Sequence, residues 1–237
     1  MASIELKLQQ LLQRIGDACT LAERPVQSVT LLAVSKTQSA DTVRQAHAAG
    51  QRAFGENYVQ EALAKIEALV DLRADIEWHL IGPLQSNKTR EVAAAFDWVH
   101  TVDRLKIAER LSAQRPAHLP PLQVCVQVNV SGEASKAGVD PVDVLALAQA
   151  VSTLARLRLR GLMSIPEPVD GVDAQRAPHR RLRELFDTLR SQGLPLDTLS
   201  MGMSADYALA IAEGATMVRV GSALFGARPP KSAPDPV

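Results

Sequence analysis

The feature that most constrains this chain of 237 residues is a regular alternation of apolar runs and helical patterns. Short runs of β-branched and aliphatic residues recur about eight times, and each is followed by a segment whose apolar residues have helical spacing. This alternation favours parallel strands within one sheet. We therefore predict an α/β fold, a single-domain (β/α)8 barrel over residues 1–228, with a doubly wound open sheet as the alternative.

The expected elements follow from the same pattern. Strands are expected at residues 29–35, 52–55, 77–81, 98–102, 122–130, 157–165, 198–201 and 216–220. Helices are expected at residues 41–49, 59–68, 88–95, 104–113, 141–154, 175–192 and 205–213, and an additional opening helix is indicated by the spacing of Leu8, Leu11, Leu12 and Ile15. Residues 166–178 are expected to form a long loop, and residues 229–237, which include four prolines, a disordered tail.

Side-chain alternation along the expected strands indicates which residues face the barrel interior. In the run 122–130, Val124 and Val126 share one face, whereas Cys125 lies on the other, more polar face. The aliphatic face suits packing under helices, and the polar face suits the interior. The same parity predicts that His79 and Arg219 point inward.

Composition and charge restrict the function classes. The chain is 46% hydrophobic and 22% charged, and its 26 basic residues balance 26 acidic ones, so nothing indicates binding to nucleic acid or an anionic membrane. Cys19 and Cys125 form no CxxC motif, and the N-terminus lacks a secretory signal. No window is apolar enough for a transmembrane span. We expect a soluble cytoplasmic protein and, because no apolar stripe remains outside the amphipathic helices, a monomer.

Lys36 is the first residue that indicates chemistry. It follows the first expected strand, and in a (β/α)8 barrel the functional residues lie at the carboxyl ends of the strands. A desolvated lysine amine can condense with an aldehyde to form a Schiff base.

The last two expected strands end in segments that could hold a phosphate group. Ser204 follows the seventh strand, and Gly221 and Ser222 follow the eighth. Loops at these two positions, with a short extra helix, commonly form the phosphate site of this barrel. The alternative is that both serines are ordinary helix N-caps.

Three further polar residues lie at or near strand ends. An inward Arg219 needs an acceptor, which could be a carboxylate from a neighbouring strand or a ring nitrogen of a ligand. His79 and Asn57 could be satisfied core groups or ligand contacts. An amine, a phosphate-binding segment and a polar rim together form a site suited to a phosphorylated aldehyde held as a Schiff base. Two ligands fit this description: an aldolase sugar phosphate and pyridoxal 5′-phosphate (PLP).

Several motifs in order along the chain resemble the YggS/PROSC family of PLP-binding, PLP-homeostasis proteins, which are related to the alanine racemase barrel. The match extends from about residue 5 to residue 228. The motifs are Leu32-Ala33-Val34-Ser35-Lys36-Thr37, Phe54-Gly55-Glu56-Asn57, the run from Trp78 to Lys88, Gly161-Leu162-Met163, the run from Leu199 to Asp206, and the run from Met217 to Gly226.

The resemblance implies an alanine racemase N-terminal domain-like barrel with PLP as cofactor, held by Lys36 as a Schiff base. It assigns no residue to catalysis or to a metal. The other implied roles are phosphate binding by Ser204, Gly221 and Ser222, contact of Arg219 with the pyridine nitrogen, pocket lining by Asn57, His79 and Met163, and assistance near the phosphate by Ser200.

The chain departs from the family pattern at few positions. Ser222 stands where many members have threonine, which keeps the hydroxyl group. Gln38 stands where many members have a second lysine, so a Schiff base cannot migrate to that neighbour. Lys136 lies in a segment that matches the family, and a part for it in passing PLP on is a hypothesis.

The resemblance implies PLP homeostasis and supply without robust turnover, with apo-PLP enzymes as transient partners. Arginine leaves the pyridine nitrogen neutral, which weakens the ring as an electron sink, and a racemase compensates with a second acid–base residue. The only two tyrosines, Tyr58 and Tyr207, lie at helix starts. An amino-acid racemase or decarboxylase is the alternative, and a Schiff-base aldolase is a third hypothesis.

Overall fold

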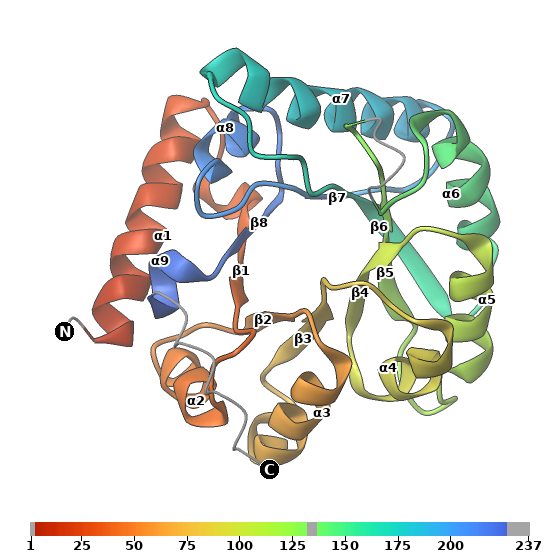
Figure 1. The fold of residues 1–237 in the computed structure, drawn as a ribbon, viewed down its shortest axis with the longest axis horizontal. Coiled ribbons are helices and arrows are strands. Elements are labelled where there is room, and N and C mark those ends of the chain that lie inside the picture. Colours follow the sequence, from red (N-terminus) through yellow and green to blue (C-terminus); the bar gives the residue numbers. More distant parts are fainter. Residues whose placement is uncertain (1–2, 132–136, 227–237) are drawn as a thin grey trace, which may run out of the picture.

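Eight parallel strands close into a barrel in the computed structural model, which describes residues 3–131 and 137–226. Each strand pairs with the next along the chain, and β8 (Met217–Val220) returns to pair with β1 (Thr30–Val34). Figure 1 shows the helices as an outer ring around the strands. The predicted (β/α)8 barrel is confirmed, and the open-sheet alternative is wrong.

The remaining strands lie close to their expected positions. They are β2 (Ala53–Glu56), β3 (Glu77–Leu80), β4 (Trp98–Val102), β5 (Leu122–Gln127), β6 (Leu157–Met163) and β7 (Thr198–Ser200). The fifth and sixth strands end earlier than expected, at Gln127 and Met163.

The α-helices alternate with the strands as expected. They are α1 (Ile4–Leu21), α2 (Ala40–Ala48), α3 (Val59–Ala68), α4 (Thr89–Ala95), α5 (Leu105–Gln114), α6 (Val144–Ser152), α7 (Val172–Ser191), α8 (Tyr207–Ala212) and α9 (Ser222–Phe225). Short 3-10 turns occur at Val26–Ser28, Val70–Leu72, Ser86–Lys88 and Pro141–Asp143.

The loop expected at residues 166–178 is only half as long in the structure. Helix α7 begins at Val172, so Pro178 lies within it. As the seventh residue of the helix, this proline removes one backbone hydrogen bond and crowds the preceding turn. The apolar stripe that continues through Leu182, Phe186 and Leu189 is buried against the barrel, and this burial outweighs the lost bond.

The core has an outer layer between strands and helices and a smaller interior. Val124 and Val126 belong to the outer layer, whereas Cys125 packs inside the barrel with Trp98 and Met163. The expected strand faces are therefore confirmed. Burial raises the pKa of the Cys125 thiol to about 12, so this cysteine is an inert packing residue.

Helix α1 lies outside the β/α alternation and covers the last part of the barrel. It packs beside α8 and α9, at the left of Figure 1, and buries Leu8, Leu11 and Ile15. Its N-cap is Ser3, whose side chain accepts a hydrogen bond from the Leu6 amide. The opening helix inferred from apolar spacing is confirmed.

Two remaining expectations concern termini and membranes. The tail at 229–237 lies outside the described residues. Within residues 3–131 and 137–226, no helix is both long and apolar enough to cross a bilayer.

Gly161 on β6 permits the close approach of β7, and its replacement tests the packing of these strands. A Cβ atom at this position would lie 1.7 Å from the Thr198 carbonyl oxygen, so the backbone would have to move. We expect Gly161→Ala to lower the free energy of unfolding by about 2 kcal/mol or more in urea titrations.

Gly16, which lies within α1, provides the control. A Cβ atom there would make an ordinary contact with the Val26 side chain at 3.7 Å. Gly16→Ala should raise the free energy of unfolding by about 0.5–1 kcal/mol, since glycine is unfavourable inside a helix. Equal effects of the two substitutions would contradict the described strand packing.

Candidate functional site

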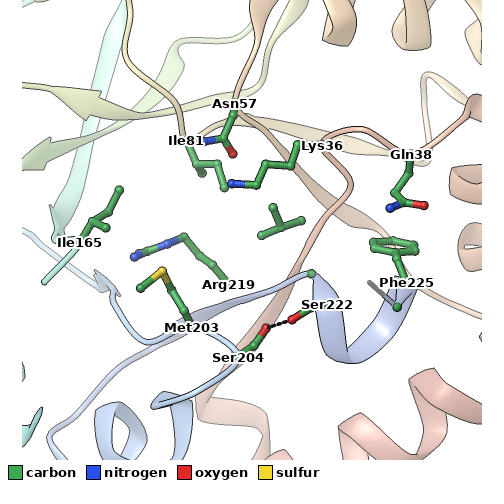
Figure 2. Close-up of a pocket in the computed structure, with 13 residues that line it drawn as sticks. Lys36, Gln38, Asn57, Ile81, Ile165, Met203, Ser204, Arg219, Ser222 and Phe225 are labelled. Carbon is green, nitrogen blue, oxygen red and sulfur yellow. Dashed lines mark hydrogen bonds between the residues drawn. The ribbon is translucent and has the colours of Figure 1, made fainter. Parts of the chain in front are cut away.

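A cavity of about 330 Å³ opens at the carboxyl ends of the strands. Its volume is in the range of small-molecule sites. The lining residues come from the last residues of β1 and β8 and from the segments that follow β1, β2, β3, β6, β7 and β8. They are Val34, Lys36, Gln38, Asn57, Ile81, Ile165, Met203, Ser204, Arg219, Gly221, Ser222, Phe225 and Gly226. Figure 2 shows the Lys36 side chain extending into this group from the end of β1.

The peptide groups on either side of Lys36 are held by a buried ionic cluster. The Lys65 ammonium donates to the Ser35 carbonyl oxygen at 2.6 Å and to Glu56 Oε1 at 2.8 Å. The Ser35 hydroxyl also donates to Glu56 Oε1, at 2.6 Å. The residue before Lys36 is thus fixed through both its backbone and its side chain.

Glu61 completes the cluster on the other side of Lys36. Its Oε1 accepts from the Lys65 ammonium at 2.5 Å and from the Thr37 backbone amide at 2.6 Å. Thr37 has a φ of 64°, a left-handed conformation that costs a non-glycine residue about 1–2 kcal/mol. The hydrogen bond from its amide offsets this cost and turns the chain sharply after Lys36.

Burial governs the charges in this cluster. Glu56 is fully buried, and this desolvation raises the pKa of its carboxyl group, although Lys65 and Ser35 act in the opposite direction. Lys65 is 5% exposed and bonds to both carboxylates. It therefore balances the charge of Glu56, which water cannot solvate, and of Glu61, which is partly exposed.

Arg219 reaches the cavity from β8 and is 3% exposed. Its Nη1 donates to the Ser200 carbonyl oxygen at 2.6 Å and to the Ser200 hydroxyl at 2.8 Å, and its Nη2 donates to the Ser164 carbonyl oxygen at 2.7 Å. Desolvation lowers the pKa of Arg219 to about 10, while Asp206 raises it through space. The guanidinium therefore stays charged at neutral pH.

Ser204 and Ser222 bring the last two strand ends together. The Ser222 hydroxyl donates to the Ser204 hydroxyl at 3.1 Å, as Figure 2 shows. The N-cap of α8 is Asp206 and that of α9 is Gly221, so neither serine is a helix N-cap and that alternative is wrong.

Asp206 fixes the segment that carries Ser204. Its Oδ1 accepts from the Met203 amide at 2.6 Å, and its Oδ2 is 2.9 Å from Nε2 of the buried His179 on α7. Burial alone would raise the pKa of Asp206, but the hydrogen bonds from His179 and the Met203 backbone outweigh it and leave the pKa lowered.

Asn57 offers the cavity an unsatisfied polar atom. Its Oδ1 is buried and has no hydrogen-bond partner among the described residues. Gly82 allows the chain to pass close to the Asn57 backbone, since a Cβ atom at Gly82 would lie 2.0 Å from the Asn57 carbonyl oxygen. A buried amide oxygen without a hydrogen-bond donor is unfavourable, and a ligand that donates to it would bind more tightly.

The structure thus brings six of the nine predicted site residues to one cavity: Lys36, Asn57, Ser204, Arg219, Gly221 and Ser222. The other three, His79, Met163 and Ser200, are fully buried in the barrel and do not line it. Ser200 contacts Arg219 from behind, and Met163 packs on Trp98 and Cys125. Lys136 lies outside the described residues.

Sequence reasoning missed the supporting residues and the apolar wall. Lys65 gave a signal, because it shares the buried face of α3 with Ala62, three residues earlier, where an unpaired charge would be unfavourable. Ile81, Met203 and Phe225 gave none, since apolar residues after a strand are indistinguishable from core residues in sequence.

Comparisons with known proteins agree with the fold and the cavity. The family model for the alanine racemase N-terminal domain matches residues 6–229. The pyridoxal phosphate homeostasis protein of Pseudomonas aeruginosa is 60% identical over 228 residues, which cover 96% of this chain and 97% of that protein. The chain belongs to the family of pyridoxal phosphate homeostasis proteins, whose fold is the alanine racemase N-terminal domain. The family resemblance inferred from the motifs is confirmed.

Other relatives in the family extend the comparison. The pyridoxal phosphate homeostasis protein of Escherichia coli K12 is 51% identical over 229 residues, 96% of this chain and 98% of that protein. PipY of Synechococcus elongatus PCC7942, solved with PLP bound, has a TM-score of 0.81 and 42% identity over 94% of this chain and all of that chain. An alanine racemase of Clostridium difficile 630 shares only the fold, with a TM-score of 0.71 and 13% identity.

The role of Lys65 can be tested by its removal. Lys65→Met should lower the free energy of unfolding by about 3 kcal/mol or more, because two carboxylates would lose their shared cation. Urea titration at neutral pH measures the effect. Lys106→Met, at an exposed position on α5, should change it by less than about 0.5 kcal/mol.

A second substitution shows whether the loss arises from unpaired charge. Glu56→Gln combined with Lys65→Met should recover part of the stability, since the most buried carboxylate is then neutral. A double variant that is less stable than Lys65→Met would contradict this account of the cluster.

Proposed function

We propose that this protein binds PLP in the cavity through a covalent bond to Lys36 and takes part in the homeostasis and supply of PLP. One observation carries the proposal: an amine, a buried guanidinium and two paired hydroxyl groups line a single cavity of small-molecule size. The names of the relatives and the PLP bound to PipY support it.

The residues present fit the groups of PLP. When bound, PLP supplies an aldehyde carbon with which an amine can condense, releasing one water molecule. Ser204, Gly221 and Ser222 would hold the phosphate, and Arg219 would face the pyridine nitrogen. Asn57, whose buried Oδ1 has no partner among the described residues, would accept a hydrogen bond.

The ionic cluster around Lys65 gives Lys36 a fixed starting point. Since the peptide groups before and after Lys36 are both held, the side chain enters the cavity with little backbone freedom. Less conformational entropy is then lost when its amine is bound covalently.

The charges of the cavity favour binding over turnover. Among the described residues that line it, the ionisable side chains are Lys36 and Arg219. Arg219 stays charged at neutral pH and does not give up its proton readily. Tyr58 and Tyr207, at the starts of α3 and α8, are not among the lining residues. We therefore propose that the protein is not an enzyme.

The covalent bond can be tested with Lys36→Ala. The loaded parental protein should absorb visible light and, after borohydride reduction, carry one PLP adduct on the peptide that contains Lys36. The variant should lose both signals, because the reacting amine is absent. Lys106→Ala, at an exposed position, is the matched control and should keep both. A borohydride-stable adduct elsewhere in Lys36→Ala would contradict the assignment.

The absence of turnover can be tested by solvent deuterium exchange at Cα of a panel of amino acids. The loaded protein should exchange these protons no faster than free PLP does, because no second acid–base group lines the described part of the cavity. Exchange well above that of free PLP, lost in Lys36→Ala, would support the racemase or decarboxylase alternative instead.

A further inference from the structure

A chain of polar side chains runs through the barrel interior behind Arg219. The Arg219 Nη1 donates to the Ser200 hydroxyl oxygen at 2.8 Å, and that oxygen is 2.9 Å from Nδ1 of His100. Nε2 of His100 is 2.9 Å from Nδ1 of His79. Nε2 of His79 has no hydrogen-bond partner among the described residues, and the nearest carboxylate oxygen, Glu77 Oε2, is 3.7 Å away. Four strands contribute: β8, β7, β4 and β3.

The Arg219 end of this chain sets its hydrogen-bond direction, and the negative charge of Glu77 at the other end favours the same direction. Arg219 can only donate, so the Ser200 oxygen is an acceptor and its own proton is available for His100. His100 then accepts at Nδ1 and donates from Nε2 to His79, whose proton lies on Nε2 towards the Glu77 carboxylate. The opposite direction would aim a histidine lone pair at Glu77 and leave the Ser200 proton to find another acceptor.

For both histidines, burial favours the neutral form that this direction requires. Burial lowers the pKa of His100, and His79 and Arg219 lower it further. Burial also lowers the pKa of His79, although Glu77 and Asp97 act in the opposite direction. Protonation of either ring would remove an acceptor and interrupt the chain.

Aromatic packing fixes the orientation of the rings. His79 stacks on Trp98 with ring centroids 5.1 Å apart and an interplanar angle of 12°. His100 lies 5.2 Å from His79 and 5.7 Å from Trp98. Because these rings cannot rotate freely in a packed interior, His100 Nδ1 stays aimed at the Ser200 hydroxyl.

The geometry points to His100 and His79 as positioning residues that act on Arg219 through Ser200. They orient the Ser200 hydroxyl so that its oxygen faces the guanidinium. This hydrogen bond acts together with those to the Ser200 and Ser164 carbonyl oxygens to hold Arg219 towards the cavity. The effect on a bound ligand rests on the proposed function, in which Arg219 faces the pyridine nitrogen.

The hydrogen-bond direction can be tested without PLP. In protein labelled with ¹⁵N-histidine, nuclear magnetic resonance should show both His79 and His100 as neutral rings with the proton on Nε2 from about pH 7 to 8. The five histidines can be assigned with single variants. A His100 ring protonated on Nδ1, or one that titrates in this range, would overturn the inference.

The action on Arg219 is tested with PLP. His100→Phe keeps an aromatic ring but removes both hydrogen bonds, so PLP affinity should fall about tenfold, as for loss of a bond to a charged group. The absorption band of PLP bound to His100→Phe should shift in the same direction as that of PLP bound to Arg219→Gln. His118→Phe, at an exposed position, is the matched control and should change neither.

Ser200→Ala serves if His100→Phe does not fold, because it removes only the shared hydroxyl. It should reproduce the lower affinity and the band shift. Parental affinity and spectrum in a folded His100→Phe or Ser200→Ala protein would overturn the inference. If the parental protein itself fails to bind PLP, the proposed function fails, and the histidine spectra still decide whether the chain exists.

Discussion

The pairing of β1 with β8 is the constraint on which the rest of the structure depends. It places Leu32 opposite Arg219 and Ala33 opposite Val220, although these residues are far apart in sequence. Closure therefore brings the end of the first strand, with Lys36, beside the end of the last, with Ser222. An open sheet would leave these two strands on different edges, and a site built from both could not form.

Burial inside the barrel and beneath its helices also requires charged groups to find partners within the protein. Lys65 is satisfied by two carboxylates and a carbonyl oxygen, and Arg219 by serine oxygens. Each network fixes one side of the cavity, because a buried charge with several hydrogen bonds has few alternative arrangements. The cavity is thus shaped by the same interactions that make its buried charges tolerable.

The proposed role follows from what these networks permit. A fixed amine, a charged arginine and two hydroxyl groups can hold a phosphorylated aldehyde, whereas turnover would require a further group that moves protons. The fold is shared with an alanine racemase, yet the fold alone does not carry the activity. The chemistry is decided by the side chains at the strand ends.

The barrel and six of the thirteen residues that line the cavity could be predicted from the sequence. Strand and helix periodicity depends on local side-chain spacing, and the carboxyl ends of parallel strands meet at one face, so Lys36, Asn57 and Ser204 could be placed from the pattern and the resemblance together. The loop expected up to Pro178 was too long, because burial of the apolar face of α7 outweighed the local helix-breaking effect of the proline. Only the tertiary structure decided that His79 and Ser200 lie behind Arg219 rather than in the cavity, and that His100 joins them. Strand parity tells whether a side chain points inward but not how deep it lies, because depth depends on the stagger between neighbouring strands once the barrel has closed.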